Sequence, residues 1–265
     1  MVWFMSRASR HHIPNQVWHI THRCHQRDFL FKFAKDRKCW LEWLYEARKR
    51  YGLCILNYMV TSNHIHLLVV DDESDVISKS LQLVAGRTAQ AFNRRKKRKG
   101  SFWEDRYHAT AIEGGEYLLR CLIYMDMNMV RAGVVSHPSQ WEHSGYHEIQ
   151  SPPQRYRLID RRKLVELVGL ADEKELQHLH SEWVGQACLQ KQAKQTPWVE
   201  AVAVGSEAFV LGMKEKMGMR VLGRKVDLDN DIYTLREPES AYNAHFDSKK
   251  VLLSAENAVY FDEML

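Results

Sequence analysis

The alternation of apolar and polar positions predicts a regular succession of strands and helices over the first half of the chain. Alternating side chains indicate strands, and apolar residues that recur every three or four positions indicate helices. We expect strands at residues 16–24, 54–60, 64–70 and 107–112, and helices at residues 36–50, 76–95 and 116–131. Residues 61–63 read as a turn, which makes the second and third strands a hairpin. This order predicts an α+β fold with an antiparallel sheet and helices packed mainly on one face.

The sequence Ser-Pro-Pro-Gln at residues 151–154 interrupts this succession. Such a segment is typical of a boundary. Beyond it, residues 160–196 and 205–218 have helical character, whereas the end of the chain has weak periodicity. We therefore expect three parts: a first domain at residues 1–150, a mainly helical extension at 151–225 and a tail at 226–265.

Composition narrows the class of protein. The chain has 265 residues, of which 45% are hydrophobic and 27% charged, which favours a folded protein over a disordered one. Its longest aliphatic run, residues 67–70, is far shorter than the roughly 18 to 20 residues of a membrane-spanning helix. The N-terminal residues lack a secretory signal pattern, so we expect a cytoplasmic protein with no membrane partner. Five cysteines without a C-x-x-C pair argue against a disulfide framework and a thiolate zinc site.

Charge and histidine are unevenly distributed. The formal net charge of +5 combines +7 at residues 1–150, +4 at 151–225 and −6 at 226–265. The tail is therefore acidic. Eleven of the 14 histidines precede residue 150, so we expect the chemistry in the first domain.

A run of six basic side chains is the focus of the positive charge. Like charges repel in a compact core, so the run belongs on an exposed loop or helix end, where phosphate is the natural partner. A solvated surface loop is the equally simple alternative. Aromatic residues close behind it, Phe102, Trp103 and Tyr107, could stack on bases and favour a nucleic acid. The run consists of Arg94, Arg95, Lys96, Lys97, Arg98 and Lys99.

Two histidines alternate on the third predicted strand. Side chains at i and i+2 of a strand point the same way, so His64 and His66 share one face while Ile65 and Leu67 share the other. Two neighbouring imidazoles form half of a metal site and need at least one further ligand. Taken alone, a histidine pair on a strand is more often structural.

Tyr124 and Asn128 are the second candidate pair. Residues four apart lie on one face of a helix, so both side chains project together from an otherwise largely apolar helix. A buried Asn without polar partners costs on the order of 1 to 3 kcal/mol. Its amide oxygen could complete a metal site with the histidines, although a satisfied core Asn and a structural tyrosine are the more frequent cases.

Together these segments resemble one known family. The sequence Asn-His-Ile-His-Leu-Leu at residues 63–68 resembles the histidine–hydrophobe–histidine motif of the HUH single-tyrosine transposases, which include IS200-like enzymes and REP-associated relatives. Residues 124–135 resemble the family's tyrosine helix, in which Asn follows Tyr by four positions and Val-Arg-Ala-Gly comes next. Residues 101–108 are similar to the segment before that helix. The resemblance covers roughly residues 12–150.

The resemblance implies a ferredoxin-like or RRM-like antiparallel sheet and metal-dependent cleavage and rejoining of single-stranded DNA. Tyr124 would be the catalytic nucleophile that forms a 5′-phosphotyrosine. His64, His66 and Asn128 would bind one Mg²⁺ or Mn²⁺. The expected partner is single-stranded or hairpin DNA, contacted by the run at 94–99 together with Trp103 and Arg106. The protein would be a monomer or a homodimer.

A second hypothesis belongs to another class. A domesticated relative could bind DNA or RNA hairpins through its sheet and regulate expression without catalysis. The presence of the candidate nucleophile and all three candidate ligands favours the enzyme, because a binding module has no chemical need for all four. The extension at 151–225 could help to grip DNA or be purely structural.

Overall fold

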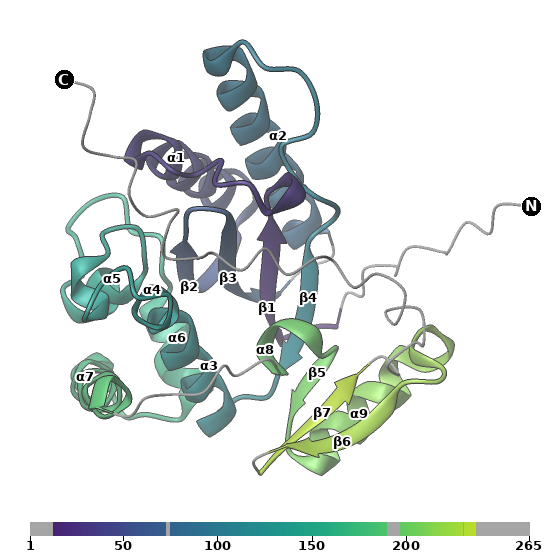
Figure 1. The fold of residues 1–265 in the computed structure, drawn as a ribbon. Helices are drawn as coiled ribbons and strands as arrows, with labels where there is room; N and C mark the ends of the chain where they lie inside the picture. The colour runs from purple at the N-terminus through teal and green to yellow at the C-terminus, as the bar shows by residue number, and fades with distance from the viewer. Residues whose placement is uncertain (1–12, 73–74, 190–196, 230, 237–265) are drawn as a thin grey trace, which may run out of the picture.

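The computed structural model describes residues 13–72, 75–189, 197–229 and 231–236. Figure 1 shows a central sheet with helices packed against it. Its first four strands are β1 (Gln16–Arg23), β2 (Cys54–Val60), β3 (His64–Asp71) and β4 (His108–Ile112). All their pairings are antiparallel, in the order β2-β3-β1-β4. The α+β class, the hairpin and the ferredoxin-like order of strands expected from the sequence are confirmed.

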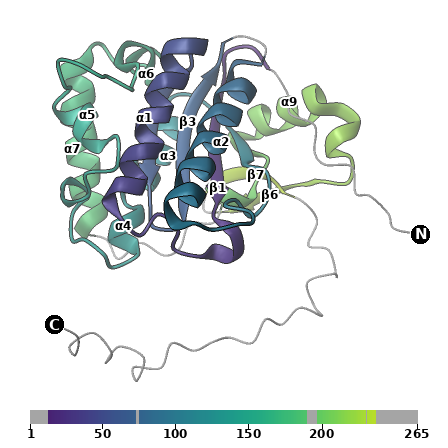
Figure 2. The same cartoon turned by 90° about the horizontal axis from the view of Figure 1, so that it is seen from above.

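Two long helices connect these strands. They are α1 (Ala34–Tyr51) and α2 (Val76–Lys96), and both bounds lie within two residues of the predicted ones. Gly52 caps the C-terminal end of α1, and its φ of 72° is the left-handed conformation that glycine adopts at little cost. The two helices pack against each other on one face of the sheet (Figure 2).

Both faces of the sheet are covered, which corrects the expectation that helices pack mainly on one. The face opposite α1 and α2 carries α3 (Glu116–Asp126), which contacts β2 and β4. His66 lies on this second face and is only 1% exposed. The histidine pair therefore lies beneath a helix rather than on an open sheet surface, because α3 and the extension bury it.

The predicted helix at residues 116–131 is interrupted. Helix α3 ends at Asp126, Met127 has φ −74° and ψ −1°, and a short helix, α4 (Asn128–Arg131), follows. The carbonyl of Tyr124 would accept the amide of residue 128 in a continuous helix. It accepts Arg131 Nη2 at 2.7 Å instead.

The extension is mainly helical and packs directly on the first domain. Helix α7 contacts α3, and α8 contacts β1 and β4. The predicted helix at 160–196 is two helices separated by Gly169, and residues 190–196 lie outside the described part. The helices of this region are α6 (Arg161–Val168), α7 (Glu173–Leu189), α8 (Pro197–Glu200) and α9 (Glu207–Met217), and α5 (Tyr146–Gln150) comes directly before it.

Three further strands, which the sequence analysis did not predict, extend the sheet to seven in the order β2-β3-β1-β4-β5-β7-β6. Strand β5 pairs in parallel with β4, so the complete sheet is mixed. A hairpin of β6 and β7 occupies the start of the expected acidic tail, and residues 237–265 lie outside the described part. The strands are β5 (Ala203–Gly205), β6 (Lys225–Asp229) and β7 (Ile232–Arg236).

A buried polar network joins α3 to α7. His180 Nε2 donates to Asp126 Oδ2 at 2.6 Å, and both side chains are fully buried. Asn57 Nδ2 donates to Asp126 Oδ1 at 3.2 Å, and Gln150 Nε2 donates to His180 Nδ1 at 2.7 Å. The network fixes the end of α3 from two sides. No helix among the described residues is long and apolar enough to cross a membrane.

Candidate functional site

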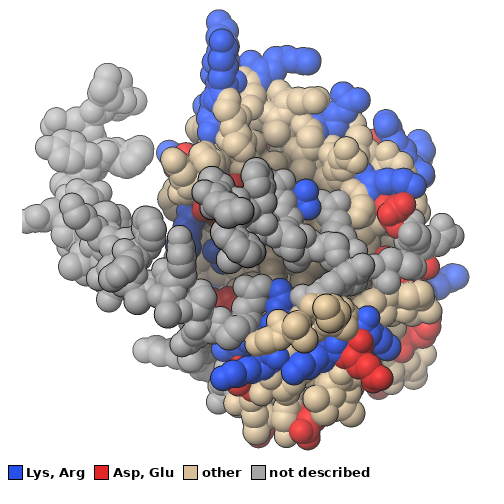
Figure 3. Space-filling view, turned by 90° about the vertical axis from the view of Figure 1, so that its right-hand side faces the viewer, with Lys and Arg blue, Asp and Glu red and all other residues tan. Residues whose placement is uncertain are grey.

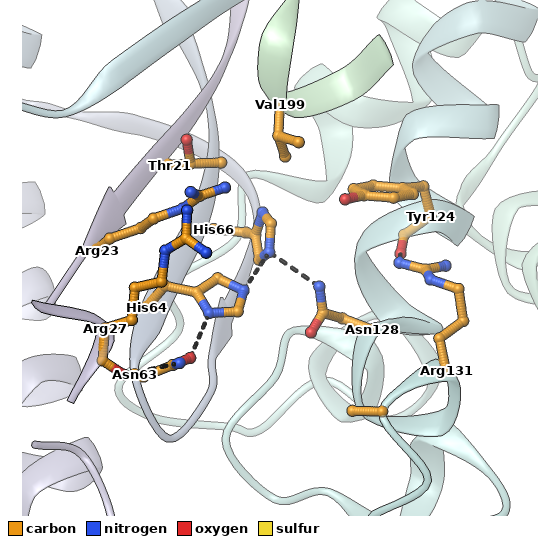
Figure 4. Close-up of a pocket in the computed structure, with 11 residues that line it drawn as sticks. Thr21, Arg23, Arg27, Asn63, His64, His66, Tyr124, Asn128, Arg131 and Val199 are labelled. Atoms are coloured by element: carbon orange, nitrogen blue, oxygen red, sulfur yellow. Dashed lines mark hydrogen bonds between the residues drawn. The ribbon is translucent and has the colours of Figure 1, made fainter. Parts of the chain in front are cut away.

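The two candidate pairs from the sequence meet in one cavity. It has a volume of about 550 Å³ and opens at the end of the sheet where β1 finishes and β3 begins (Figure 4). Three arginines lie around the two histidines, the tyrosine and the asparagine. The lining consists of Thr21, Arg23, Arg27, Asn63, His64, His66, Tyr124, Asn128, Arg131, Ala132 and Val199.

His64 turns one nitrogen toward the turn before β3 and the other into the cavity. Its Nδ1 lies 2.7 Å from Asn63 Oδ1 and 3.0 Å from Thr61 Oγ1. An amide oxygen only accepts, so Nδ1 carries the proton and Nε2 keeps a lone pair. Burial lowers the pKa of His64 to about 4, so the ring is neutral at pH 7.

His66 is enclosed between the sheet and α3. Its Nε2 lies 3.0 Å from His64 Nε2 and 2.9 Å from Asn128 Nδ2. Its Nδ1 lies 2.9 Å from His19 Nε2 on the neighbouring strand β1. Burial, aided by the neighbouring rings His64 and His19, places the pKa of His66 well below the ordinary value of 6.5. The ring is therefore neutral, and Nε2 faces the cavity.

These donor atoms have the spacing of ligands on one cation. With bonds of 2.0 to 2.1 Å, adjacent ligands of an octahedral ion lie about 2.8 to 3.0 Å apart, which matches the distances from His66 Nε2 to His64 Nε2 and to the Asn128 amide. A half-turn of the Asn128 amide brings Oδ1 to the present place of Nδ2. Two imidazole nitrogens and an amide oxygen suit a divalent metal. Within the described residues no cluster of three or more His, Cys, Asp or Glu fits a metal, so this set depends on Asn128.

Tyr124 enters the cavity from α3, opposite the histidines (Figure 4). Its ring is 7% exposed and stands edge-on to His66, with the ring centres 6.0 Å apart. The Arg131 guanidinium lies over the other side of the ring, 4.3 Å from its centre. Burial raises the pKa of Tyr124, and the positive charges of Arg131 and Arg23 oppose that rise. Tyr124 and Asn128 line the same cavity even though the helix is interrupted at Met127 between them.

The basic run at 94–99 lies at the same end of the sheet as the cavity. Helix α2 begins beyond the far end of β3 and ends at Lys96, so its last turn returns to the end where His64 lies. Lys and Arg gather at the top of Figure 3, where α2 ends. Two members already have protein partners: Arg95 pairs with Asp36, and Arg98 donates to the Ser101 carbonyl at 2.9 Å. The exposed remainder is Arg94, Lys96, Lys97 and Lys99.

Trp103 and Arg106 differ in their surroundings. Trp103 is half-buried: its ring stacks on His22 with centres 3.9 Å apart, and Nε1 donates to the Ala85 carbonyl at 3.0 Å. One face of the indole is thus covered by the protein. Arg106 is exposed. Neither residue lines the cavity.

Sequence reasoning missed five neighbours of the candidate ligands and nucleophile. Strand β1 carries His19 and Arg23, and Arg27 follows shortly after it. The even spacing of His19 and Arg23 along the strand could have indicated that they share one face of the sheet. Arg131 belongs to the Val-Arg-Ala-Gly segment, which gives no sign of its contacts with Tyr124. No sequence signal indicated that α8, from the extension, would supply Val199 to the cavity wall.

Comparisons with known proteins find similarity mainly in the first part of the chain. Residues 12–125 match the family described as IS200-like transposases. Among solved structures, a REP-associated tyrosine transposase bound to a REP hairpin is 20% identical, with 54% of this chain and 84% of that chain covered and a TM-score of 0.46. A candidate transposase from Deinococcus radiodurans R1 is 16% identical, with 39% and 83% covered and a TM-score of 0.31. No curated protein sequence matches the chain.

The matched segment contains β1 to β4, both histidines and Tyr124, and it ends three residues before Asn128. Residues 12–125 of this chain are therefore similar to the IS200-like transposases.

Proposed function

We propose that this protein is a metal-dependent transposase that cleaves and rejoins single-stranded DNA, at sites that contain hairpins, through a 5′-phosphotyrosine on Tyr124. One observation carries the proposal. Tyr124 and the three candidate ligands His64, His66 and Asn128 line one cavity, although about 60 residues of sequence separate the tyrosine from the histidines. A fold that needed these side chains only for packing would not require their polar atoms to converge.

The reaction consists of two phosphoryl transfers. In the first, Tyr124 Oη loses its proton and attacks a backbone phosphorus, a P–Oη bond forms, and the P–O3′ bond breaks to release a protonated 3′-hydroxyl. In the second, a 3′-hydroxyl attacks the same phosphorus, and tyrosine leaves and regains a proton. One phosphodiester is replaced by another, so no nucleotide cofactor is consumed.

His64 and His66 would hold Mg²⁺ or Mn²⁺ through their Nε2 lone pairs, and Asn128 through Oδ1. A divalent cation at this place would polarise the phosphoryl oxygens and help to align the bond that breaks. Tyrosine ordinarily titrates near pH 10, so the Tyr124 hydroxyl needs help to lose its proton at neutral pH. The positive charge of Arg131, which stacks on the ring, favours the phenolate that must form. Its charge also lies where the phosphotyrosine would form.

Arg23 and Arg27 are exposed at the rim of the cavity and are suited to phosphates on either side of the scissile one. The four exposed members of the run at 94–99 would extend this contact along the DNA. Arg106 and the free edge of Trp103 complete the proposed DNA contacts.

The test is covalent capture. Full-length protein is incubated with a labelled pool of single-stranded hairpin oligonucleotides with random flanks, in Mg²⁺, Mn²⁺ or EDTA, and analysed under denaturing conditions. We expect a metal-dependent adduct whose DNA-linked peptide contains Tyr124, no adduct with Tyr124→Phe, and unchanged hairpin binding by that variant. Tyr117→Phe, a change on the same helix outside the cavity lining, is the matched control and should form adduct normally.

Adducts that persist in Tyr124→Phe would reject the assignment of the nucleophile. Tight hairpin binding by the wild type with no adduct in any metal would favour the regulator, a non-catalytic DNA- or RNA-binding protein.

A further inference from the structure

His19 lies behind the candidate metal ligands and is absent from the cavity lining. It comes from the middle of β1, and its side chain is fully buried. Its ring stacks on His66 with an interplanar angle of 9° and ring centres 5.1 Å apart. Both nitrogens have partners: Nε2 lies 2.9 Å from His66 Nδ1, and Nδ1 lies 2.7 Å from the backbone carbonyl of Trp198.

The partners determine where the protons lie. The Trp198 carbonyl can only accept, so His19 Nδ1 must carry a proton and donate it. Full burial without a carboxylate partner keeps the ring neutral, so His19 Nε2 has a lone pair and accepts. The donor in that second hydrogen bond is then His66 Nδ1. A neutral imidazole carries one proton, so His66 Nε2 is left with a lone pair facing His64 and Asn128.

The carbonyl at the start of this chain of hydrogen bonds belongs to the extension. Trp198 lies in α8 and is fully buried. The segment after it is attached to β4: Thr110 Oγ1 donates to the Ala201 carbonyl at 2.7 Å, and the amide of Ala111 donates to the Val202 carbonyl at 2.8 Å. The acceptor for His19 therefore has a fixed position.

We infer that His19 is a positioning residue: it holds His66 in the tautomer that presents the Nε2 lone pair to the metal, and the extension sets this state through the Trp198 carbonyl. The inference rests on the metal role given to His66 under the proposed function. It assigns the extension a part in the site itself, in addition to any contact with DNA.

Three substitutions of His19 distinguish a role in positioning His66 from a role in packing alone. His19→Phe keeps a ring but removes both hydrogen bonds. His19→Asn has an amide that reaches the place of Nδ1 and can still donate to Trp198, but is too short for His66. His19→Gln places an amide oxygen near the former Nε2 and can accept from His66. If His19 is a positioning residue, Mn²⁺ affinity should be lost in His19→Phe and His19→Asn and recovered in His19→Gln.

The first readout is Mn²⁺ affinity of the full-length, DNA-free protein, measured by electron paramagnetic resonance of free Mn²⁺. Removing a partner of a metal-bound histidine typically lowers affinity by about tenfold to a hundredfold. We expect that loss in His19→Phe and His19→Asn, and affinity near the wild-type value in His19→Gln. Thermal unfolding, measured in parallel, identifies any variant that is not folded at the assay temperature.

The second readout needs no metal. In protein labelled with ¹⁵N-histidine, the ring shifts of His66 distinguish the Nδ1–H tautomer from the Nε2–H tautomer, with His66→Gln used to assign the signal. We expect Nδ1–H in the wild type and in His19→Gln, and a mixture in His19→Phe. Wild-type Mn²⁺ affinity in His19→Phe, or an unchanged His66 tautomer in that variant, would overturn the inference. Absence of Mn²⁺ binding by the wild type would instead overturn the metal role in the proposed function.

Discussion

The guanidinium of Arg131 covers the ring of Tyr124 at 4.3 Å and bonds the carbonyl of the same residue at 2.7 Å. Its Nη1 is buried and has no hydrogen-bond partner within the described residues. A buried donor without a partner is costly. Here it lies beside the proposed nucleophile, where a phosphate oxygen would supply the missing acceptor.

We therefore expect Arg131→Gln to slow formation of the covalent adduct by roughly a hundredfold to a thousandfold. The guanidinium charge is lost both for the phenolate and for the phosphate, while His64, His66 and Asn128 remain. Rates are measured by quenching the hairpin reaction at a series of times, and Mn²⁺ affinity is measured on the same samples.

Arg131→Lys is the matched variant, since it retains the charge but not the planar stacking and forked donors. Its rate of adduct formation should lie between the rates of the wild type and of Arg131→Gln. An adduct rate unchanged in Arg131→Gln would remove Arg131 from the proposed chemistry.

The pair His180 and Asp126 should be important for stability. Removing one partner of a buried hydrogen bond leaves the other group unsatisfied, which typically costs about 1 to 3 kcal/mol and more where that group is charged. We expect His180→Ala to lower the free energy of unfolding by an amount near that range, because the Asp126 carboxylate would keep only its bond from Asn57. Urea unfolding measures the change.

The double-variant cycle with Asp126→Asn tests whether the two side chains act together. If they do, the loss in the double variant is clearly smaller than the sum of the single losses. Additive losses would show that each side chain is stabilised independently. His178→Ala, a change on the exposed side of the same helix, should have little effect and controls for helix propensity.

Acidification should destabilise the protein through its buried neutral histidines. Burial lowers the pKa of His19, His64 and His143 to about 4, against an ordinary value of 6.5. Between these values the unfolded chain binds more protons than the folded one, so the free energy of unfolding falls as pH decreases from about 6.5 toward 4. Each ring contributes a slope of at most about 1.4 kcal/mol per pH unit.

His143→Gln separates this effect from the titration of carboxylates, which is common to both proteins. His143 lies outside the cavity lining, so the comparison leaves the proposed metal site intact. The variant should show a smaller slope between pH 6.5 and 4 in chemical unfolding. An equal slope in the two proteins would mean that His143 does not resist protonation in the folded state.

Much of the fold could be predicted because local signals and tertiary packing agree in the first domain. Strand β1 and the start of β3 alternate, β2 and the rest of β3 are short apolar runs, and Asn63 and Gly52 mark ends of neighbouring elements. The hairpin of β6 and β7 was missed because its short strands lie in a segment with strong negative charge. The parallel pairing of β5 could not be predicted, because a strand of three residues is too short to show an alternation of apolar and polar positions.

The candidate site could be predicted only where the spacing of two residues along the sequence determines whether their side chains point the same way. His64 and His66 share a face because they are two apart on a strand, and Tyr124 and Asn128 were expected together because they are four apart. The break at Met127 has no sequence signal, and neither does the hydrogen bond from Arg131 to the Tyr124 carbonyl that accompanies it. Alternation along β1 could have placed His19 on the face of the site, but the role we infer for it could not be predicted, because that role depends on a carbonyl 179 residues away.

The salt dependence of DNA binding tests the basic run by charge count. Arg95 and Arg98 have protein partners, so we expect phosphate contacts from the exposed members Arg94, Lys96, Lys97 and Lys99. Each neutralised contact to single-stranded DNA should reduce the slope of log K against log salt by about 0.7. Alanine at all four positions should therefore flatten the slope by up to about 2.8, measured by fluorescence anisotropy with a labelled hairpin.

Alanine at Arg155 and Lys174, two exposed basic positions in the extension, should leave that slope nearly unchanged. A smaller slope in this control than in the wild type would mean that the extension also contacts phosphate. An unchanged slope in the fourfold variant would exclude the run from the DNA interface, because loss of phosphate contacts must reduce the number of counterions released. Arg23 and Arg27 would then be the residues that contact DNA phosphates at the cavity. In that case the alanine variant of each should reduce the slope of log K against log salt.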